Sequence, residues 1–349
     1  MPDPQLDRDT FSRRFQAQFT DPVFDTMKDA VEQVTRGASD AYSHHRKSPR
    51  THPAGESYAD PTYELADDWI AAARAVSDAQ ALYDDMDAPA KILIVSCSSR
   101  SEHTCPGEMS KSWRLAQLAA ETCRTSGLVP EVVDLSRLAA EYGRTIHPCK
   151  ACFSTSPALC HWPCSCYPNY SLGQAHDWMN EIYPLWVEAR GVLIVTPVNW
   201  YQPSSPMKLM MDRLVCADGG NPDPTLTQGK DAKKAKALEL QGWDYPRHLA
   251  GRLFGVVVYG DSEGAENVRR LLADWMQSME MISAGFKAGV DRYVGYYEPY
   301  ATSHAALDRD KDFQAEVRNA ARTLCEAVTA QRSGLLTSAG QGLEDPRPK

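Results

Sequence analysis

No stretch of this sequence approaches the ~20 consecutive apolar residues that a membrane-spanning helix needs. Positive charge is also scarce. Acidic side chains (46) outnumber basic ones (37), for a net charge of −9 at pH 7, whereas nucleic-acid-binding domains usually present a basic face. The opening residues, MPDPQLDRDTFSRRF, lack the apolar stretch of a secretory signal peptide. We therefore expect a cytoplasmic protein that binds neither membranes nor nucleic acid.

The cysteine content is unusual for that compartment. Ten cysteines would be many if they formed structural disulfides, which reducing conditions disfavour. Five of the ten lie between Cys149 and Cys166, so their local density is more informative than the total. The other proportions, 43% hydrophobic and 24% charged residues, are those of an ordinary globular protein. A chain of 349 residues can form one large domain or two small ones.

Residues 1–90 have a helical character. Apolar side chains recur there at spacings of three to four, as on one helix face: Phe11, Phe15, Phe19, Val23, Met27 and Val31. A polar, Pro- and His-rich stretch at 43–57 predicts a linker, and a second helical pattern covers 65–83. We predict a helical N-terminal extension that packs on the main domain or on a second subunit, with a separate binding module as the alternative.

From Lys91 onward, strand and helix patterns alternate. Short apolar runs predict buried strands at 91–97, 129–135, 191–197 and 252–260, with a weaker fifth strand at 290–294. Helical patterns follow at 111–125, 177–188, 207–215 and 268–281. Repeated βα units predict an α/β fold, a doubly wound five-stranded parallel sheet over 91–300. A C-terminal helix (about 305–330) and tail would complete the chain over 301–349. Ligands of such sheets bind beyond the carboxyl ends of the strands.

The loop after the first of these strands is rich in hydroxyl groups and opens a helix. Hydroxyls, exposed backbone N–H groups and a helix N-terminus suit a terminal phosphate. The loop contains neither a GxGxxG nor a Walker motif, which disfavours an ordinary dinucleotide site. The candidate phosphate ligands are Ser98, Arg100, Ser110, Lys111 and Ser112. A polar turn with helix-capping residues is the alternative.

Two further loops end at the same predicted edge. After the strand at 191–197, prolines and aromatics form a stiff wall that suits a flat aromatic ligand, or alternatively a packed core edge. Its residues are Pro197, Val198, Asn199, Trp200 and Tyr201. After the strand at 252–260, glycines permit close backbone approach. The residues of that loop are Gly260, Asp261 and Gly264.

With these loops in order, the segment from Lys91 to Tyr296 resembles the flavodoxin-like NAD(P)H-dependent FMN reductases, including their iron–sulfur flavoprotein branch. The run SSRS at 98–101, followed by Ser110, is similar to that family's phosphate loop, although it is longer here. The run TPVNWYQPSSPMKLMMDRL (196–214) is similar to the stretch that lines the flavin ring, with Asn199 where the family usually has Tyr. The glycine-bearing loop matches the third flavin loop.

The resemblance implies a flavodoxin-like fold with FMN at the three loops and NAD(P)H as cosubstrate. Stacking on the flavin ring would come from Trp200 or Tyr201. We interpret Lys208, Asp212 and Arg213 as an ion-pair set that fixes the loop, and we assign no catalytic residue. Because the flavin of this family commonly lies at a subunit interface, a homodimer or homotetramer is also implied.

The cysteine-rich segment, 147–170, has a pattern of its own. Soft sulfur ligands suit iron–sulfur or zinc sites, and the resemblance implies a [4Fe-4S] cluster held by four of five cysteines: Cys149, Cys152, Cys160, Cys164 and Cys166. The spacing departs from that of the iron–sulfur branch, since Thr155 occupies the third cysteine position. Zinc, or metal-free thiols including a redox-active disulfide, are the alternatives.

The sequence thus predicts an FMN-dependent oxidoreductase that takes electrons from NAD(P)H and passes them to a quinone, a flavin or another small acceptor. One alternative is an iron–sulfur flavoprotein that relays single electrons from a ferredoxin-like donor. Another is a non-catalytic redox sensor or scaffold. The region 217–250 is too long for an ordinary connection, and we interpret it as a lid or interface insertion near the flavin. Trp243 and Tyr245 within it are candidates for substrate or partner contacts.

Overall fold

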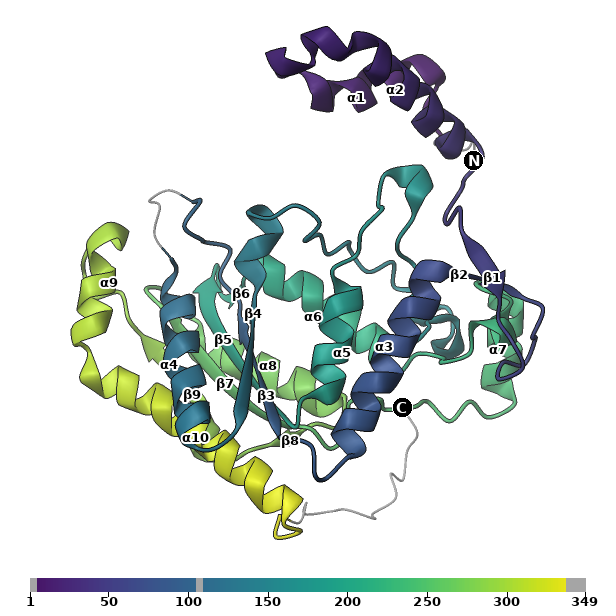
Figure 1. Cartoon of the computed structure of the whole chain (residues 1–349). Helices are drawn as coiled ribbons and strands as arrows, with labels where there is room; N and C mark the ends of the chain where they lie inside the picture. The colour runs from purple at the N-terminus through teal and green to yellow at the C-terminus, as the bar shows by residue number, and fades with distance from the viewer. Residues whose placement is uncertain (1–4, 105–108, 337–349) are drawn as a thin grey trace.

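The computed structural model describes residues 5–104 and 109–336 (Figure 1). At its centre lies a parallel sheet whose main strands are those predicted from the sequence. In spatial order they are β4 (Val129–Asp134), β3 (Lys91–Ser96), β5 (Gly191–Asn199), β7 (Leu253–Gly260) and β9 (Gly289–Tyr293). Numbered along the chain, this order is 2-1-3-4-5, which is that of a flavodoxin-like sheet. The predicted fold class is confirmed.

The sheet has seven strands where five were predicted. The two additional strands contain two residues each, which is too short for a periodic pattern to be recognised. Strand β6 (Gln202–Pro203) pairs antiparallel with the end of β5. Strand β8 (Ile282–Ser283) pairs with the start of β7, and β9 pairs with the rest of β7.

Helices cover both faces of the sheet, as the βα alternation predicted. On one face, α4 (Lys111–Thr125) and α10 (Lys311–Arg332) pack against alternate residues of the strands. The opposite face carries four helices: α3 (Asp67–Asp84), α5 (Met179–Glu188), α6 (Ser205–Asp218) and α8 (Ala265–Ser278). Because the strands are apolar on both sides, each face forms its own core.

The N-terminal extension is helical, as predicted, but its first pattern does not form one helix. Helix α1 (Arg8–Gln16) is followed by two 3-10 turns (Ala17–Phe19 and Pro22–Met27) and then by α2 (Lys28–Ser43). Pro22 lies inside the predicted stretch and interrupts it. Both helices project away from the main body (Figure 1). The predicted linker at 43–57 is not entirely irregular, because it contains strand β1 (Thr51–Pro53), which pairs antiparallel with β2 (Glu64–Ala66) before α3.

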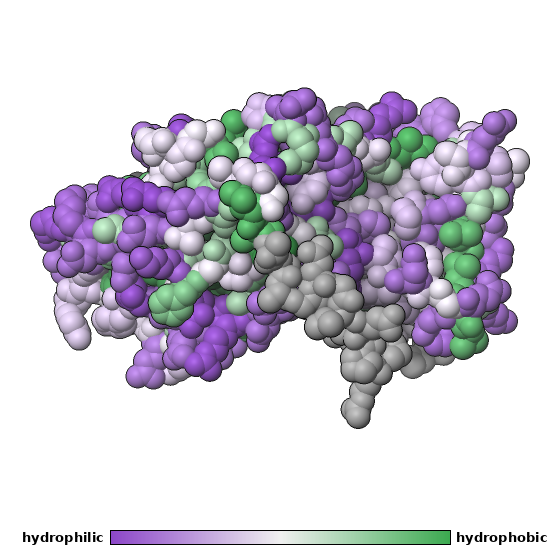
Figure 2. Space-filling model, turned by 90° about the horizontal axis from the view of Figure 1, so that it is seen from below, coloured by the Kyte–Doolittle hydropathy of each residue, from purple (hydrophilic) through white to green (hydrophobic). Residues whose placement is uncertain are grey.

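The C-terminal helical region is divided. Helix α9 (Tyr300–Arg309) ends at Asp310, whose side chain accepts a hydrogen bond from the backbone N–H of Phe313 and so caps α10. The predicted helix over 305–330 is therefore two helices. The part of the chain that the structure describes contains no helix that is long and apolar enough to cross a membrane. Seen from below, the surface is largely hydrophilic and its apolar groups are separated by polar ones (Figure 2).

Candidate functional site

The loops after β3, β5 and β7 meet around a hollow of about 280 Å³ at the carboxyl edge of the sheet. Eight of the thirteen predicted cofactor-binding residues line it: Ser98, Arg100, Lys111, Pro197, Val198, Asn199, Gly260 and Asp261. The remaining lining residues were not selected from the sequence: Ser99, Tyr259, Val294 and Tyr300. The hollow therefore combines the three loops with residues near the start of α9.

One end of the hollow is positively charged. Arg100 and Lys111 both line it, and Lys111 is the first residue of α4. The hydroxyl of Ser98 accepts a hydrogen bond from the backbone N–H of Arg100 (3.1 Å), which fixes the turn between β3 and the helix. Two cations beside a helix N-terminus favour an anionic group.

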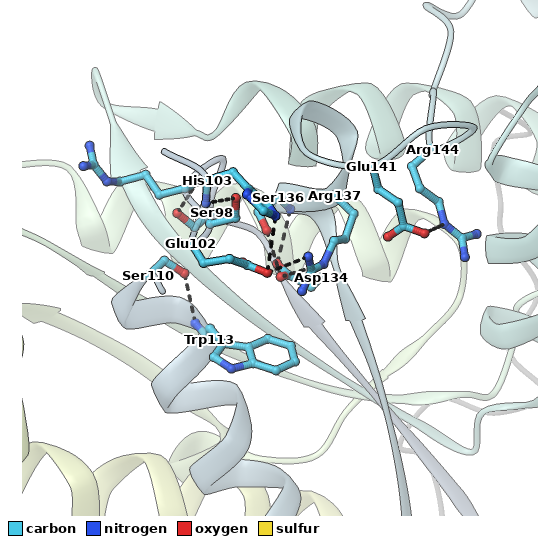
Figure 3. Close-up of polar contacts among 12 residues, drawn as sticks. Ser98, Glu102, His103, Ser110, Trp113, Asp134, Ser136, Arg137, Glu141 and Arg144 are labelled. Atoms are coloured by element: carbon cyan, nitrogen blue, oxygen red, sulfur yellow. Dashed lines mark hydrogen bonds and ion pairs between the residues drawn. The ribbon is translucent and has the colours of Figure 1, made fainter. Parts of the chain in front are cut away.

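Two of the predicted phosphate ligands, Ser110 and Ser112, make contacts within the protein. Ser110 is the N-cap of α4, and its hydroxyl accepts from the backbone N–H of Trp113 (3.1 Å; Figure 3). Ser112 is buried and its hydroxyl lies 2.8 Å from that of Tyr259. Neither side chain lines the hollow. The capping alternative therefore describes Ser110 correctly.

The first loop is also tied to the end of β4 (Figure 3). Arg137 donates to the carboxylate of Glu102 (3.0 Å) and lies 3.8 Å from that of Asp134. Asp134 accepts from the hydroxyl of Ser136 (2.8 Å), and burial raises the pKa of this carboxyl. These contacts link the first loop to β4 and to the turn that follows it.

Tyr300 is the clearest contributor that the sequence analysis missed. Its ring lies 4.0 Å from the guanidinium carbon of Arg100 and 4.3 Å from the ammonium nitrogen of Lys111. Both distances are those of cation–π contacts. Tyr300 follows the loop after β7 by about forty residues and precedes no recognisable motif, so only the three-dimensional fold reveals its position.

The second loop forms a tight hairpin between β5 and β6. Val198 pairs with Pro203 and Asn199 with Gln202. The two turn residues, Trp200 and Tyr201, have positive φ values of 50° and 64°, as a two-residue hairpin turn of type I′ requires. Their side chains point outward and are 93% and 59% exposed. They do not line the hollow, so the wall beside it consists of Pro197, Val198 and Asn199.

Trp200 instead borders a second, more open hollow of about 540 Å³. Asn199 lines both hollows, which therefore adjoin at that residue. The far side of the second hollow is formed by α6 through Lys208, Leu209 and Asp212. Lys208 and Asp212 form an ion pair (2.5 Å) one helical turn apart.

The third loop lies directly against the second. A Cβ atom on Gly260 would come within 3.1 Å of the side chain of Val198, and one on Gly264 within 3.1 Å of Cα of Tyr201. Gly264 also has a φ of +111°, which favours glycine. This close approach explains the glycines, since larger residues would push the two loops apart.

Arg213 has a structural role, but its ion pair is with Asp177 and not within the predicted set of Lys208, Asp212 and Arg213. Its guanidinium donates two hydrogen bonds to the carboxylate of Asp177 (3.0 and 2.5 Å), and both side chains are fully buried. It also donates to the backbone carbonyl of His147 (3.1 Å). Helix α6 is thereby fixed to α5 and to the start of the cysteine-rich segment.

The sequence profile of the NADPH-dependent FMN reductases matches residues 90–291. The chain belongs to this family. Among solved structures, RosB with the bound intermediate 8-demethyl-8-formylriboflavin-5′-phosphate is 14% identical, with a TM-score of 0.48 over 74% of this chain and 90% of that one. An oxidoreductase from Corynebacterium diphtheriae is 11% identical, with a TM-score of 0.37 over 69% and 97% of the two chains. No curated protein matches the chain.

In this member of the FMN reductase family, the insertion at 217–250 lies over the cysteine-rich segment. It contains a 3-10 turn (Pro224–Thr227) and α7 (Ala232–Leu240). Trp243 packs on a small apolar cluster that includes Leu159, and Tyr245 makes an edge-to-face contact with Phe153 (5.3 Å). None of residues 217–250 lines the first hollow, so the described insertion does not cover it.

The cysteine-rich segment contains thiols that lie close to one another. The sulfur atoms of Cys152 and Cys166 are 3.4 Å apart, and this hydrogen bond lowers the pKa of Cys152 to about 6. The thiol of Cys216, in α6, lowers the pKa of Cys149 to about 6. Cys216 lies 50 residues after the motif, so sequence spacing could not identify it.

The predicted metal ligands do not converge on a common point. Among residues 5–104 and 109–336, no group of three or more His, Cys, Asp or Glu side chains is arranged to hold a metal ion. Cys160, Cys164 and Cys166 are buried, whereas Cys149 and Cys152 are half-buried, and the printed sulfur contact within the set is the one between Cys152 and Cys166. The residues therefore do not fit the [4Fe-4S] cluster that the resemblance implied, and the structure does not support it.

Proposed function

We propose that this protein is an FMN-dependent oxidoreductase that takes electrons from NAD(P)H and passes them to a small acceptor such as a quinone or a flavin. The observation that carries the proposal is the difference between the two parts of the first hollow, one cationic and the other a proline-bearing wall. Two cations and a helix N-terminus lie at one end, and a proline-bearing strand end forms the wall. A phosphate attached to a flat ring system matches both features.

The residues present fit FMN in a definite orientation. Arg100 and Lys111 would hold the phosphate, with the N-terminus of α4 adding backbone donors. The stretch from Pro197 to Asn199 would face the ring, with Gly260 and Asp261 on the neighbouring loop. When bound, FMN supplies the hydride chemistry itself, and the protein binds, orients and polarises it. Because the cofactor would supply the chemistry, the reaction needs no acid–base side chain, and we assign none.

The second hollow is the proposed acceptor site. It adjoins the ring end of the first hollow at Asn199 and presents the exposed indole of Trp200 opposite α6. A flat aromatic acceptor would gain stacking and apolar contact with Trp200. A cytoplasmic location, where NAD(P)H is available, completes the proposal.

We also propose a homodimer or homotetramer. Several aromatic side chains on and after the loops of the hollow are more than half exposed: Trp200, Tyr201, Tyr293 and Tyr297. A second copy that covers them would remove this apolar area from water. Light scattering of the purified protein measures the assembly directly, and a monomer at all concentrations would contradict this part of the proposal.

Titration with FMN, followed by NADPH and NADH oxidation with a quinone acceptor, tests the function. Arg100→Ala or Lys111→Ala should weaken FMN binding by roughly tenfold to a hundredfold, because each removes a charge-assisted contact with the phosphate. Arg124→Ala is the matched control, since Arg124 lies at the other end of α4 and pairs with the exposed Glu121. It should bind FMN normally. Flavin binding without oxidation of either nicotinamide would overturn the reductase proposal.

A further inference from the structure

Tyr259 joins the end of a strand to the start of a helix at the first hollow. It is the next-to-last residue of β7, and it lines the hollow although only 5% of it is exposed. Its ring belongs to the core on the face of the sheet that α4 and α10 cover. Its hydroxyl oxygen lies 2.8 Å from that of Ser112, in the first turn of α4. A rigid aromatic side chain thus carries a hydroxyl group to the N-terminus of α4.

This hydroxyl lies close to the cationic end of the hollow. Arg100 and Lys111 line the same hollow as Tyr259, and Lys111 directly precedes Ser112 in the first turn of α4. A terminal phosphate has three strong acceptor oxygens, so it can accept several hydrogen bonds in addition to its contacts with two cations. A neutral donor held at this place would therefore find an acceptor on a bound phosphate.

The two hydroxyls have one proton more than their mutual contact requires. A hydroxyl donates one hydrogen bond and can accept two, and either oxygen can be the donor in the contact between Ser112 and Tyr259. Ser112 is fully buried and does not line the hollow, whereas Tyr259 does. When Ser112 donates, the O–H of Tyr259 is left for a ligand in the hollow. Burial raises the pKa of Tyr259, so this hydroxyl keeps its proton at physiological pH.

We propose that the hydroxyl of Tyr259 is a ligand of the terminal phosphate, oriented by Ser112, and that it lets the hollow distinguish FMN from riboflavin. This assignment rests on the proposed function, because it places the phosphate of FMN in the first hollow. Riboflavin has no phosphate and gains nothing from the donor. Since the core holds the ring of Tyr259, little side-chain freedom is lost when the hydroxyl meets its acceptor.

The first test compares two ligands that differ only in the phosphate. FMN and riboflavin are titrated into the full-length protein and into Tyr259→Phe, and flavin fluorescence gives the four affinities. The variant keeps the ring and loses the hydroxyl. It should bind FMN roughly tenfold to a hundredfold more weakly, as expected for a lost hydrogen bond to a charged group, and riboflavin within about twofold of the natural protein. An unchanged FMN affinity, or an equal loss for both ligands, would overturn the proposal.

Tyr183→Phe is the matched control. Tyr183 is also fully buried, and its hydroxyl donates to the backbone carbonyl of Arg213 (3.1 Å) on the opposite face of the sheet. It does not line the first hollow. This variant loses a buried hydrogen bond and some stability, but it should keep the natural ratio of FMN affinity to riboflavin affinity. A ratio that falls as far as in Tyr259→Phe would show that any lost buried hydroxyl has this effect, and would contradict the phosphate contact.

Ser112→Ala tests the positioning role. It should weaken FMN binding by a smaller factor than Tyr259→Phe and leave riboflavin binding unchanged, because the hydroxyl of Tyr259 remains but loses the partner that orients it. The double variant should bind FMN as Tyr259→Phe does, since Ser112 acts through the tyrosine. Additive losses in the double variant would show that Ser112 acts independently of Tyr259, and would overturn its assignment.

A phosphorus NMR spectrum of the bound FMN gives a readout that does not depend on turnover. The phosphate resonance should shift between the natural protein and Tyr259→Phe, and it should stay in place in Tyr183→Phe. If the natural protein binds neither FMN nor riboflavin, the proposed function fails. If it binds both equally tightly, or if Tyr259→Phe keeps the natural affinity ratio and phosphate resonance, the flavin assignment stands and the role of Tyr259 is overturned.

Discussion

Tyr300 places its aromatic ring against the two cations of the first hollow, Arg100 and Lys111, and this contact leads to a prediction for a single residue. Tyr300→Ala should weaken FMN binding by roughly 3- to 30-fold, because Arg100 and Lys111 lose the cation–π contacts that orient them. Tyr300→Phe keeps the ring and should bind FMN within about twofold of the natural protein. The measurement is a fluorescence titration of FMN. Equal losses in both variants would show that the hydroxyl, rather than the ring, matters.

Asp218, at the end of α6, should make the free energy of unfolding depend on pH. Burial raises the pKa of its carboxyl to about 7, compared with ~3.9 for an unfolded chain. Between these values the folded protein keeps a proton that the unfolded chain releases, so the stabilising contribution is complete below about pH 4 and is lost as the pH rises toward 7. Asp218→Asn removes this dependence and can still accept the hydrogen bond from the backbone N–H of Leu249 (2.7 Å).

Thermal unfolding of both proteins between pH 4 and 8 measures this effect. The variant should gain stability relative to the natural protein as the pH rises through this window, by roughly 2–4 kcal/mol at the alkaline end. The difference between the two proteins is the informative quantity, since all other titrating groups are common to both. Parallel pH profiles would contradict the assignment.

For single residues, the sequence predicted the lining of the hollow best where the local structure alone determines the position of the side chain. Arg100 and Lys111 both line the hollow, because a loop and a helix N-terminus fix their positions locally. Ser110 and Ser112 do not line it, since a hydroxyl serves equally well as a helix cap or a buried partner, and spacing does not distinguish these roles. Tyr300 and Cys216 could not be predicted, because each reaches its site through tertiary packing.

At the scale of elements, the β7–α8 loop and the β5–β6 hairpin form one unit whose spacing depends on glycine. Gly264→Ala should destabilise the fold by roughly 1–3 kcal/mol and weaken FMN binding, because the new methyl group meets Cα of Tyr201 and the backbone has a positive φ. Gly242→Ala is the matched control. Gly242 has a φ of +97° but no neighbouring atom within 4 Å, so its substitution adds backbone strain without a clash.

Chemical denaturation and FMN titration of the two glycine variants separate these contributions. The control should lose some stability and keep its affinity for FMN, whereas Gly264→Ala should lose both. If both variants bind FMN normally, the contact between the two loops does not position the flavin wall.

The elements themselves were predictable where the pattern is long. Strands β3, β5 and β7 and helix α4 were found close to their observed bounds because almost fully buried strands are continuous apolar runs and α4 has a clear amphipathic period. Strands β6 and β8 are too short to carry such a pattern. The division between α9 and α10 at Asp310 was missed because an N-cap residue inside a continuous helical pattern resembles an ordinary surface position.

At the scale of the whole molecule, the N-terminal extension consists of two parts with different roles. Helix α1 buries no residue, and the arm formed by α1 and α2 projects from the body (Figure 1). The arm meets the body at the 3-10 turn Tyr170–Leu172, which contacts α2 and donates backbone hydrogen bonds to the carbonyls of Arg46 and Lys47, just after α2. Helix α3, by contrast, belongs to the core on one face of the sheet.

This difference predicts opposite results for two truncations. Removal of residues 1–43 should leave FMN binding unchanged and alter the melting temperature by no more than about 2 °C, because almost no apolar area of the body becomes exposed. Removal of residues 1–84 also deletes α3 and exposes the core that Trp69 and Val76 help to cover. It further removes the carbonyl of Tyr83 that accepts from Arg190. The longer truncation should therefore unfold or aggregate. Differential scanning calorimetry compares the two directly, and a stable, flavin-binding protein without residues 1–84 would show that α3 is an accessory rather than part of the core.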